Sequence, residues 1–288
     1  MKWMMVILSK FLFVSIGLIL LSAFTGLFRD DPQMDWQLYI EIVLNIIQSF
    51  IHPELLTVTA ITGHEHQIFE SFWPLYKYSL LIFLPALFLS ILLSILLSYL
   101  TILLPEKIRL RVTQAAALLE STPDLLIILV IQASILALME STGILLFSVA
   151  ATTQNPSYVL PIVALSLIPA LMFYKVTLFL VNDELKKPYV DLAKGKGFTW
   201  STIFFRHIFR NITPSLFSHS KAILLILLSS MFVFERIFNI SGLFTYLIRY
   251  PEPDVIAFAL ILFYVPIFLL YMLFSALIAR TTGQRMEW

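Results

Sequence analysis

Six long runs of apolar residues alternate with shorter polar segments along the chain. Each run is close to the length of about 20 mostly apolar residues that a membrane-spanning helix needs. The ten-residue alternation of apolar and polar positions that marks a membrane β-barrel is absent, so helices rather than strands must satisfy the backbone hydrogen bonds. The sequence therefore predicts an all-α integral membrane protein with six transmembrane helices. The runs are Phe11–Phe28, Tyr78–Pro105, Leu125–Ala150, Tyr158–Asn182, Leu216–Phe234 and Val255–Ala279.

The composition agrees with this pattern and excludes most other classes of protein. Of the 288 residues, 59% are hydrophobic and 13% are charged. An ordinary soluble domain carries about 25% charged residues, so this chain cannot cover a water-facing surface of its size. The absence of cysteine excludes a small secreted domain held together by disulfides, and the high hydrophobic content excludes a disordered chain.

Lysine and arginine gather on one side of the predicted spans, and this asymmetry sets the orientation. With six spans, both ends of the chain lie on the same side of the membrane. The opposite side carries only Arg29, Lys77, Arg236 and Arg249, beside many acidic residues. Because cytoplasmic loops are enriched in Lys and Arg, we expect both termini in the cytoplasm. The basic residues on that side are Lys2, Lys10, Lys107, Arg109, Arg111, Lys186, Lys187, Lys194, Lys196, Arg206, Arg210, Lys221, Arg280 and Arg285.

The first apolar run follows Lys2 and Lys10, as the apolar part of a cleaved signal peptide does. The run is long, however, and its removal would leave five spans with the two ends on opposite sides. We therefore interpret it as a retained membrane anchor.

Two segments outside the predicted spans are large. Arg29–Lys77 is expected outside the cell and Asp183–Thr213 in the cytoplasm, while Glu106–Ser121 and Arg236–Asp254 form shorter loops. Within the external segment, the apolar stretch Trp36–Phe50 predicts an amphipathic helix that packs on the bundle or contacts a binding protein.

The large cytoplasmic segment contains two of the chain's eight glycines, Gly195 and Gly197. Glycine commonly ends a helix in a left-handed turn. A helix over Asp183–Lys194 is therefore expected to stop at this pair.

A second helix is expected after the glycine turn. Thr199 is a suitable N-cap for a helix that runs toward Arg210, and Asn211 and Pro214 mark the start of the fifth span. On the residue pattern alone, this arrangement also fits an amphipathic loop that lies on anionic lipid head groups.

The residues of this segment carry a resemblance to a known family. Tyr189-Val190-Asp191-Leu192-Ala193-Lys194-Gly195-Lys196-Gly197 is followed by Arg206-His207, Arg210-Asn211 and Pro214. This pattern resembles the EAA loop of the permease subunits of bacterial ABC importers, and most of all that of the oligopeptide, dipeptide and nickel branch.

Two further stretches extend the resemblance, which covers about Tyr78–Ala279. Val233–Leu243 resembles the family's V-x-E-x-x-F-x-x-P-G-L stretch, with Ser241 in place of the usual proline. Thr122-Pro123-Asp124 is similar to the start of the third span in this family.

The chain also departs from the family's pattern. The motif's Glu-Ala-Ala is Asp191-Leu192-Ala193 here, and Gly195 replaces a common alanine. The usual Asp-Pro-Arg ending is missing, and Arg29-Asp30-Asp31-Pro32 stands where Gly-Asp-Pro often follows the first span. These departures leave the family resemblance in place but point to no particular subgroup or substrate.

The resemblance implies a bundle like that of type I ABC importer permeases. Residues 1–77 are then the first transmembrane helix plus an extracytoplasmic segment. Residues 78–288 are the permease core of five transmembrane helices, with a cytoplasmic coupling loop over residues 183–213. The implied location is the bacterial inner membrane.

Energy for transport is expected to come from other subunits. The chain contains no G-x-x-x-x-G-K-[ST] segment, so it cannot hold a nucleotide with a P-loop, and it is expected not to be an enzyme. The resemblance implies two ATPase subunits that bind ATP and Mg, a second permease subunit of different sequence, and an extracytoplasmic solute-binding protein. No cofactor, metal or nucleic acid is expected on this chain. The implied ATPase contact comprises Tyr189, Asp191, Ala193, Gly195, Gly197, Phe198 and Trp200.

Charged residues within or beside the spans are functional candidates, because charge in a bilayer is costly. Lys175, in the fourth span, lines the translocation pathway, pairs with a carboxylate, or extends its ammonium toward the cytoplasmic surface. The resemblance suggests a gate or subunit-interface role for Glu235, with a local surface ion pair with Arg236 as the alternative. Glu120 and Asp124 lie at the cytoplasmic start of the third span, where Asp124 is typical of an acid that stabilises a helix N-terminus.

The cargo and two other functional classes stay open at this point. A peptide is the expected cargo, with a nickel or metallophore complex as the alternative. His64-Glu65-His66, near His52, is the one metal-like cluster, but histidines two apart share a face only on a strand, and we interpret the segment as an exposed polar loop. An ion-gradient-driven secondary transporter usually shows inverted repeats with broken helices, which we do not find. A membrane-embedded enzyme or a scaffold would need polar groups clustered at one depth, which the spans lack.

Overall fold

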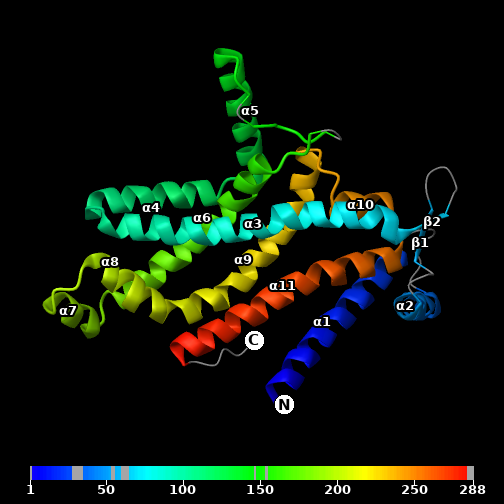
Figure 1. The fold of residues 1–288 in the computed structure, drawn as a ribbon, viewed down its shortest axis with the longest axis horizontal. Coiled ribbons are helices and arrows are strands. Elements are labelled where there is room, and N and C mark those ends of the chain that lie inside the picture. The colour runs from blue at the N-terminus through cyan, green and yellow to red at the C-terminus, as the bar shows by residue number, and fades with distance from the viewer. Residues whose placement is uncertain are drawn as a thin grey trace. The chain divides into compact units, whose positions relative to one another are not determined.

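The computed structural model describes residues 2–27, 35–52, 56–59, 65–145, 147–152 and 155–283. In this part of the chain, six helices are long and apolar enough to cross a membrane (Figure 1). The predicted all-helical architecture with six spans is therefore confirmed. The spanning stretches are Val6–Gly26, Ser71–Leu103, Asp124–Thr142, Val159–Glu184, Trp200–Ile237 and Pro253–Thr282.

The elements follow one another in an almost purely helical order. The described chain begins with α1 (Lys2–Gly26), α2 (Trp36–Ile51) and a short antiparallel pair of strands, β1 (Thr57–Thr59) and β2 (Glu65–Gln67). It continues with α3 (Ile68–Leu103), α4 (Glu106–Glu120), α5 (Asp124–Thr142), α6 (Val159–Glu184) and α7 (Pro188–Gly195). It ends with α8 (Trp200–Thr202), the π-helical turn η2 (Ile203–Ile208), α9 (Phe209–Ile237), α10 (Leu243–Arg249) and α11 (Pro253–Thr282).

Two short segments between spans are themselves helical. The helix predicted over Trp36–Phe50 is confirmed as α2, whose N-terminus is capped by the Asp35 carboxylate at 2.8 Å from the Gln37 N–H. The loop Glu106–Ser121 is almost entirely helix α4.

The third span is shorter than the apolar run that predicts it. Gly143 adopts φ 71° and its N–H bonds to the Met139 carbonyl at 2.8 Å, which ends α5 at Thr142. The prediction that this span reaches Ala150 is therefore wrong, because a left-handed glycine outweighs a continuing apolar sequence.

The fifth span is longer than predicted. The α8, η2 and α9 segments form one continuous helical stretch over Trp200–Ile237, and Pro214 lies inside α9. The expectation that Asn211 and Pro214 mark the start of the fifth span is therefore wrong, because the helix is continuous through both residues. The Thr213 hydroxyl donates to the Phe209 carbonyl at 2.7 Å, the bond to a carbonyl four residues earlier that threonine makes within helices.

The chain divides into two compact units. One consists of Met1–Leu80 and Ser241–Leu273. In it α1 packs against α2, and Ala23, Ile46 and Ala257 form a buried cluster.

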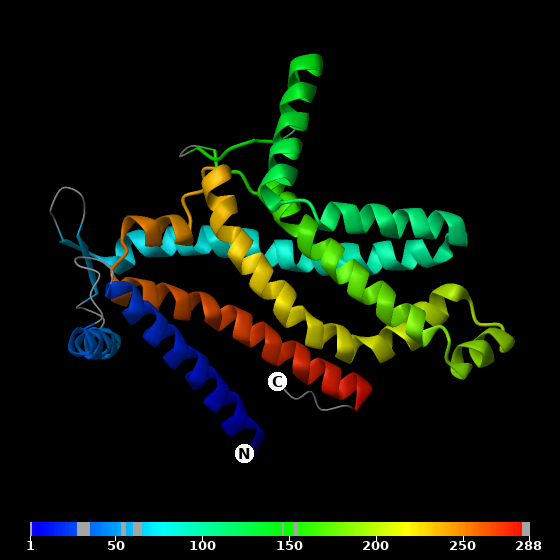
Figure 2. The same ribbon diagram turned by 180° about the vertical axis from the view of Figure 1, so that it is seen from behind.

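The other unit consists of Leu81–Ile240 and Phe274–Trp288, and it holds the candidate site. Helix α6 packs along α9 and also contacts α4 and α5 (Figure 2). A buried cluster that includes Val181, Val190 and Phe204 joins α6, α7 and η2. The expected functional division at residue 77 stays a prediction.

Candidate functional site

The loop between the fourth and fifth spans is built around the short helix α7. It begins at Pro188, which occupies the first helical turn, while Lys187 before it is extended with ψ 141°. A residue before proline is disfavoured in the helical region. The expected single helix over Asp183–Lys194 is therefore wrong: α6 ends at Glu184 and a turn separates it from α7.

One face of α7 is buried against the unit that carries it. Val190 is fully buried and Ala193 is 5% exposed. Both belong to the cluster with Ile203 and Phe204 of η2. This apolar contact, repeated at a spacing of three residues, fixes the orientation of α7 on the spans.

The C-terminus of α7 is closed by the predicted glycine turn. Gly197 adopts φ 77°, its N–H bonds to the Lys194 carbonyl at 2.9 Å, and the Phe198 N–H bonds to the Ala193 carbonyl at 3.2 Å. This pair of bonds is the Schellman arrangement, which favours glycine at the left-handed position. Gly195 instead lies in the last helical turn, and a β-carbon at either glycine would meet no atom within 4 Å.

The N-terminus of α7 is tied to the end of α6 by polar contacts. The Tyr189 phenol donates a hydrogen bond of 2.6 Å to Glu184, whose other oxygen contacts the Lys187 ammonium. Burial and, next, the bond to this carboxylate raise the pKa of Tyr189 to about 12. The phenol therefore stays a neutral hydrogen-bond donor at physiological pH.

The chain after the glycine turn is held close to α7. Thr199 is the N-cap of α8, as predicted, and its hydroxyl accepts from the Thr202 N–H at 3.4 Å. The Lys194 ammonium lies 5.9 Å from the ring centroid of Trp200, within the range of a cation–π contact. Trp200 is half-buried and packs against the same cluster as Val190.

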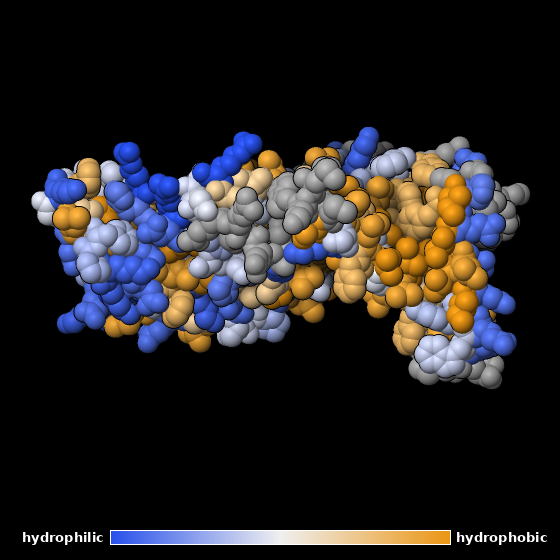
Figure 3. All heavy atoms as spheres, turned by 90° about the horizontal axis from the view of Figure 1, so that it is seen from below, coloured by the Kyte–Doolittle hydropathy of each residue, from blue (hydrophilic) through white to orange (hydrophobic). Residues whose placement is uncertain are grey.

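The opposite face of α7 is exposed. Leu192 is 61% exposed and Phe198 is 46% exposed, beside exposed Asp191 and Lys196. Hydrophilic residues gather over the region of α7 and α8, with isolated hydrophobic ones among them (Figure 3). Leu192 is missing from the residues implied by the family motif. Its place on the outer face follows from the burial of Val190 and Ala193, which the sequence pattern alone does not indicate.

The expected contact residues therefore divide into two groups. Asp191, Gly195, Gly197 and Phe198 are exposed, while Ala193 is buried and Tyr189 and Trp200 are intermediate. The exposed residues are accessible to a partner, whereas the buried and half-buried ones pack against the rest of the chain.

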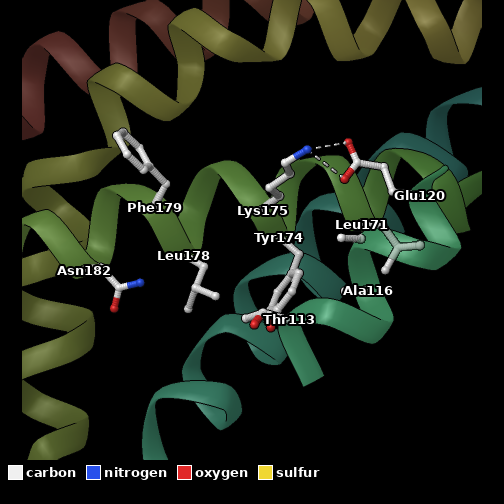
Figure 4. A pocket seen from close by; sticks show the side chains of 10 residues that line it. Thr113, Ala116, Glu120, Leu171, Tyr174, Lys175, Leu178, Phe179 and Asn182 are labelled. Atoms are coloured by element: carbon white, nitrogen blue, oxygen red, sulfur yellow. Dashed lines mark hydrogen bonds and ion pairs between the residues drawn. The ribbon is translucent and has the colours of Figure 1, made fainter. Parts of the chain in front are cut away.

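Lys175 pairs with a carboxylate, one of the three interpretations drawn from the sequence. Its ammonium lies 3.2 and 3.3 Å from the two carboxylate oxygens of Glu120, at the end of α4 (Figure 4). The Lys175 side chain is 66% exposed and that of Glu120 is 21% exposed. The pair borders a cavity of about 330 Å³ between α4 and α6.

Glu235 and Asp124 lie in different surroundings. Glu235 is 1% exposed near the end of α9, so it is not a surface side chain. Just beyond it, the Asn239 amide donates to the Ala151 carbonyl at 3.0 Å. Asp124 begins α5, as expected of a first-turn acid, and accepts a hydrogen bond of 2.6 Å from the Ser230 hydroxyl of α9.

The histidine segment, interpreted from the sequence as a polar loop, is a strand where the structure describes it. His64 lies outside the described residues, and Glu65 and His66 lie in β2. Among the described residues, no group of three or more His, Asp or Glu side chains is placed to hold a metal ion.

Comparison with known proteins gives one result for this chain. A family model described as "Binding-protein-dependent transport system inner membrane component" matches residues 79–284. The matched region includes α7, Lys175, Glu235 and most of the six spans. No curated protein matches the chain. The family match does not fit an ion-gradient-driven secondary transporter, an embedded enzyme or a scaffold.

Proposed function

The chain belongs to the family of binding-protein-dependent transport system inner membrane components, the non-catalytic permeases of ABC importers, and we propose that it forms half of an import pathway for short peptides. Permeases of this family work with ATPase and binding-protein subunits. In the proposed complex, two ATPases and a second permease of different sequence join this chain. An extracytoplasmic binding protein delivers the cargo.

The proposed coupling element is α7 with the turn that follows it. Closure of two ATPases around ATP moves the surface to which α7 is docked. ATP binds the closed state more tightly than the open one, and this difference in affinity shifts the permease between its conformations. Exposed Leu192 and Phe198 supply apolar contact area for this docking. Buried Val190 and Ala193 carry the displacement into α6 and η2, because close-packed interiors transmit strain.

The observation that carries this proposal is that α7 has one face buried against the chain and an opposite face that exposes apolar side chains. A helix that served only to connect two spans would need neither a buried face nor a capped turn beside an exposed apolar pair. The test is purification of the tagged full chain from its own membranes. We expect an ATPase subunit to co-purify with the natural chain and to be lost with the double variant L192S/F198S.

The control is the double variant L118S/L119S on α4, which changes two exposed leucines in another short helix. We expect it to retain the ATPase. Transport that continues in cells without any ATPase subunit would contradict the proposal.

The proposed orientation places both termini and α7 in the cytoplasm. It is supported by the gathering of Lys and Arg on that side of the spans. The chain has no cysteine, so single cysteines can be labelled without background. In intact cells with a permeable outer envelope, we expect an impermeant maleimide to label Q37C in α2 and not K196C beside α7. The reverse labelling would overturn the orientation.

The proposed cargo is a short peptide, in line with the resemblance to the oligopeptide, dipeptide and nickel branch. Lys175 and Glu235 are the proposed pathway and gate residues. Competition of labelled tripeptide uptake by unlabelled peptides supports this cargo. Competition by nickel or metallophore complexes, without effect of peptides, assigns the cargo to the alternative class.

A further inference from the structure

The Lys175–Glu120 pair joins a spanning helix to the short helix beside it. Lys175 lies inside α6, whereas Glu120 ends α4, outside the spanning stretches. Lys175 is about 14 Å along the axis from the end of α6 at Glu184, taking 1.5 Å of rise per residue. A lysine ammonium in contact with lipid inside a span is costly. The Lys175 side chain is 66% exposed on this chain, so its ammonium is accessible to water or cargo on this face of α6.

The pair leaves hydrogen-bonding capacity unused. An ammonium has three N–H donors, and Glu120 is the one described residue that Lys175 contacts. Two other polar groups of the cavity wall are occupied: the Tyr174 hydroxyl bonds to Thr101 at 3.1 Å, and the Thr113 hydroxyl donates to the Leu110 carbonyl at 2.9 Å. Lys175 therefore has donors available for an anion in the cavity.

A second polar group stands at the other end of the cavity. The Asn182 amide lines it about 10 Å along α6 from Lys175, two helical turns away. The apolar side chains of Leu178 and Phe179 line the wall between them, and Leu171 lies beyond Lys175 (Figure 4). At about 3.3 Å per extended residue, this spacing matches roughly three residues of a peptide.

We infer that this cavity is a transient site for the C-terminal carboxylate of a short peptide, with Lys175 as its anion-binding residue and Asn182 as a partner for a peptide group. The inference rests on the proposed function and deepens it by naming the end of the cargo that is recognised. Glu120 competes with the cargo for the ammonium. This competition keeps binding weak, as a pathway requires if the solute is to leave again.

The test uses a photoreactive tripeptide, Ala-benzoylphenylalanine-Ala, on the full chain in native membrane vesicles that contain its partner subunits. The free acid and the C-terminal amide are compared, and labelled peptides of the chain are identified by mass spectrometry. We expect the acid to label the stretches 113–120 and 171–182 about tenfold more than the amide, the effect of one charge-assisted hydrogen bond.

Two substitutions separate anion binding from a merely structural ion pair. K175M is expected to reduce labelling by the acid to the level of the amide, and K175R to restore most of it. E120Q is expected to increase labelling by the acid severalfold, because the competing carboxylate is gone. K221M is the matched control: Lys221 is an exposed lysine within a spanning helix, and its removal should change nothing.

Three results would overturn the inference: equal labelling by acid and amide, no labelling in this cavity, or a similar decrease in K175M and E120Q. The last result would mean that the pair only ties α4 to α6. Co-purification of the ATPase is measured on the same vesicles. If the ATPase co-purifies but the labelling test fails, only the inference about the cavity is rejected. If no ATPase co-purifies with the natural chain, the proposed function is rejected.

Discussion

The two short helices α7 and α4 each connect two spans, but they are fastened in different ways. Helix α7 buries Val190 and Ala193 in a cluster shared with α6 and η2, and a left-handed glycine closes its end. Helix α4 has no buried residue, and its link to α6 includes the Glu120–Lys175 ion pair. Exposed ion pairs contribute about 0–1 kcal/mol, whereas a buried valine contributes more.

The difference fits the two roles that we propose for these helices. An element that must transmit a push needs to be fixed on its inner side and free on its outer side, as α7 is. An element that forms the wall of a cavity can be held weakly, since few buried contacts oppose its displacement. The following substitutions test this contrast, from the largest expected effect to the smallest.

The largest effect is expected from Gly197→Arg at the end of α7. A left-handed conformation costs a non-glycine residue about 1–2 kcal/mol, and an arginine there projects into the open space where docking is proposed. We expect normal membrane insertion, with loss of more than 90% of ATP-dependent uptake, roughly a tenfold effect. Gly143→Arg is the control, because this glycine is also left-handed with open space around it but lies outside the proposed contact. Normal uptake by Gly197→Arg would refute the role of the turn.

The second-largest effect is expected from truncation of a buried side chain, which should distinguish α7 from α4. Val190→Ala removes a fully buried side chain and is expected to destabilise α7 by about 2 kcal/mol. Leu118→Ala in α4, where the side chain is 71% exposed, should change local stability by less than about 0.5 kcal/mol. Hydrogen exchange of the amides in each helix measures both effects. Equal effects in the two helices would contradict the contrast.

A smaller effect is expected from Tyr189→Phe, which removes the phenol bond to Glu184. The loss of a hydrogen bond to a charged group amounts to about 1.5 kcal/mol and should appear as faster exchange in the first turn of α7. The raised pKa of Tyr189 means that this stabilisation is complete below its ordinary pKa of 10.0 and disappears as the pH rises toward about 12. The difference between variant and natural chain should therefore be the same at pH 7 and pH 9. A difference that vanished by pH 9 would show that the phenol is not held as described.

Apart from the Leu118→Ala control, the smallest effect on stability is expected from Glu120→Gln in α4. Since the Lys175 side chain is two-thirds exposed, loss of the ion pair should change protection of α4 by less than about 1 kcal/mol. Exchange of the α4 amides measures it. A larger loss of protection would show that the pair is a principal fastening of this helix.

The sequence predicts some of these features because they depend on local signals. Apolar run length predicts the six spans, and Gly197 predicts the end of α7. The start of α7 differs from the prediction because Pro188 separates it from α6. The third span is shorter than predicted because Gly143, inside an uncharged stretch, ends the helix.

Other features depend on contacts between residues that are far apart in the sequence. Nothing local in the sequence indicates that Lys175 meets Glu120, since 55 positions separate them. The burial of Ala193 beside exposed Leu192 likewise depends on where η2 packs. A family motif places both residues in the same loop without saying which of them faces outward.

The most direct measurement is site-specific photocrosslinking from α7 in the assembled complex. With benzoylphenylalanine at position 192, on the exposed face of α7, we predict a crosslink to an ATPase subunit. The same group at position 118 of α4 should give none. Crosslinks from position 192 only to lipid, or to a protein outside the cytoplasm, would contradict the assignment of α7 as the coupling helix.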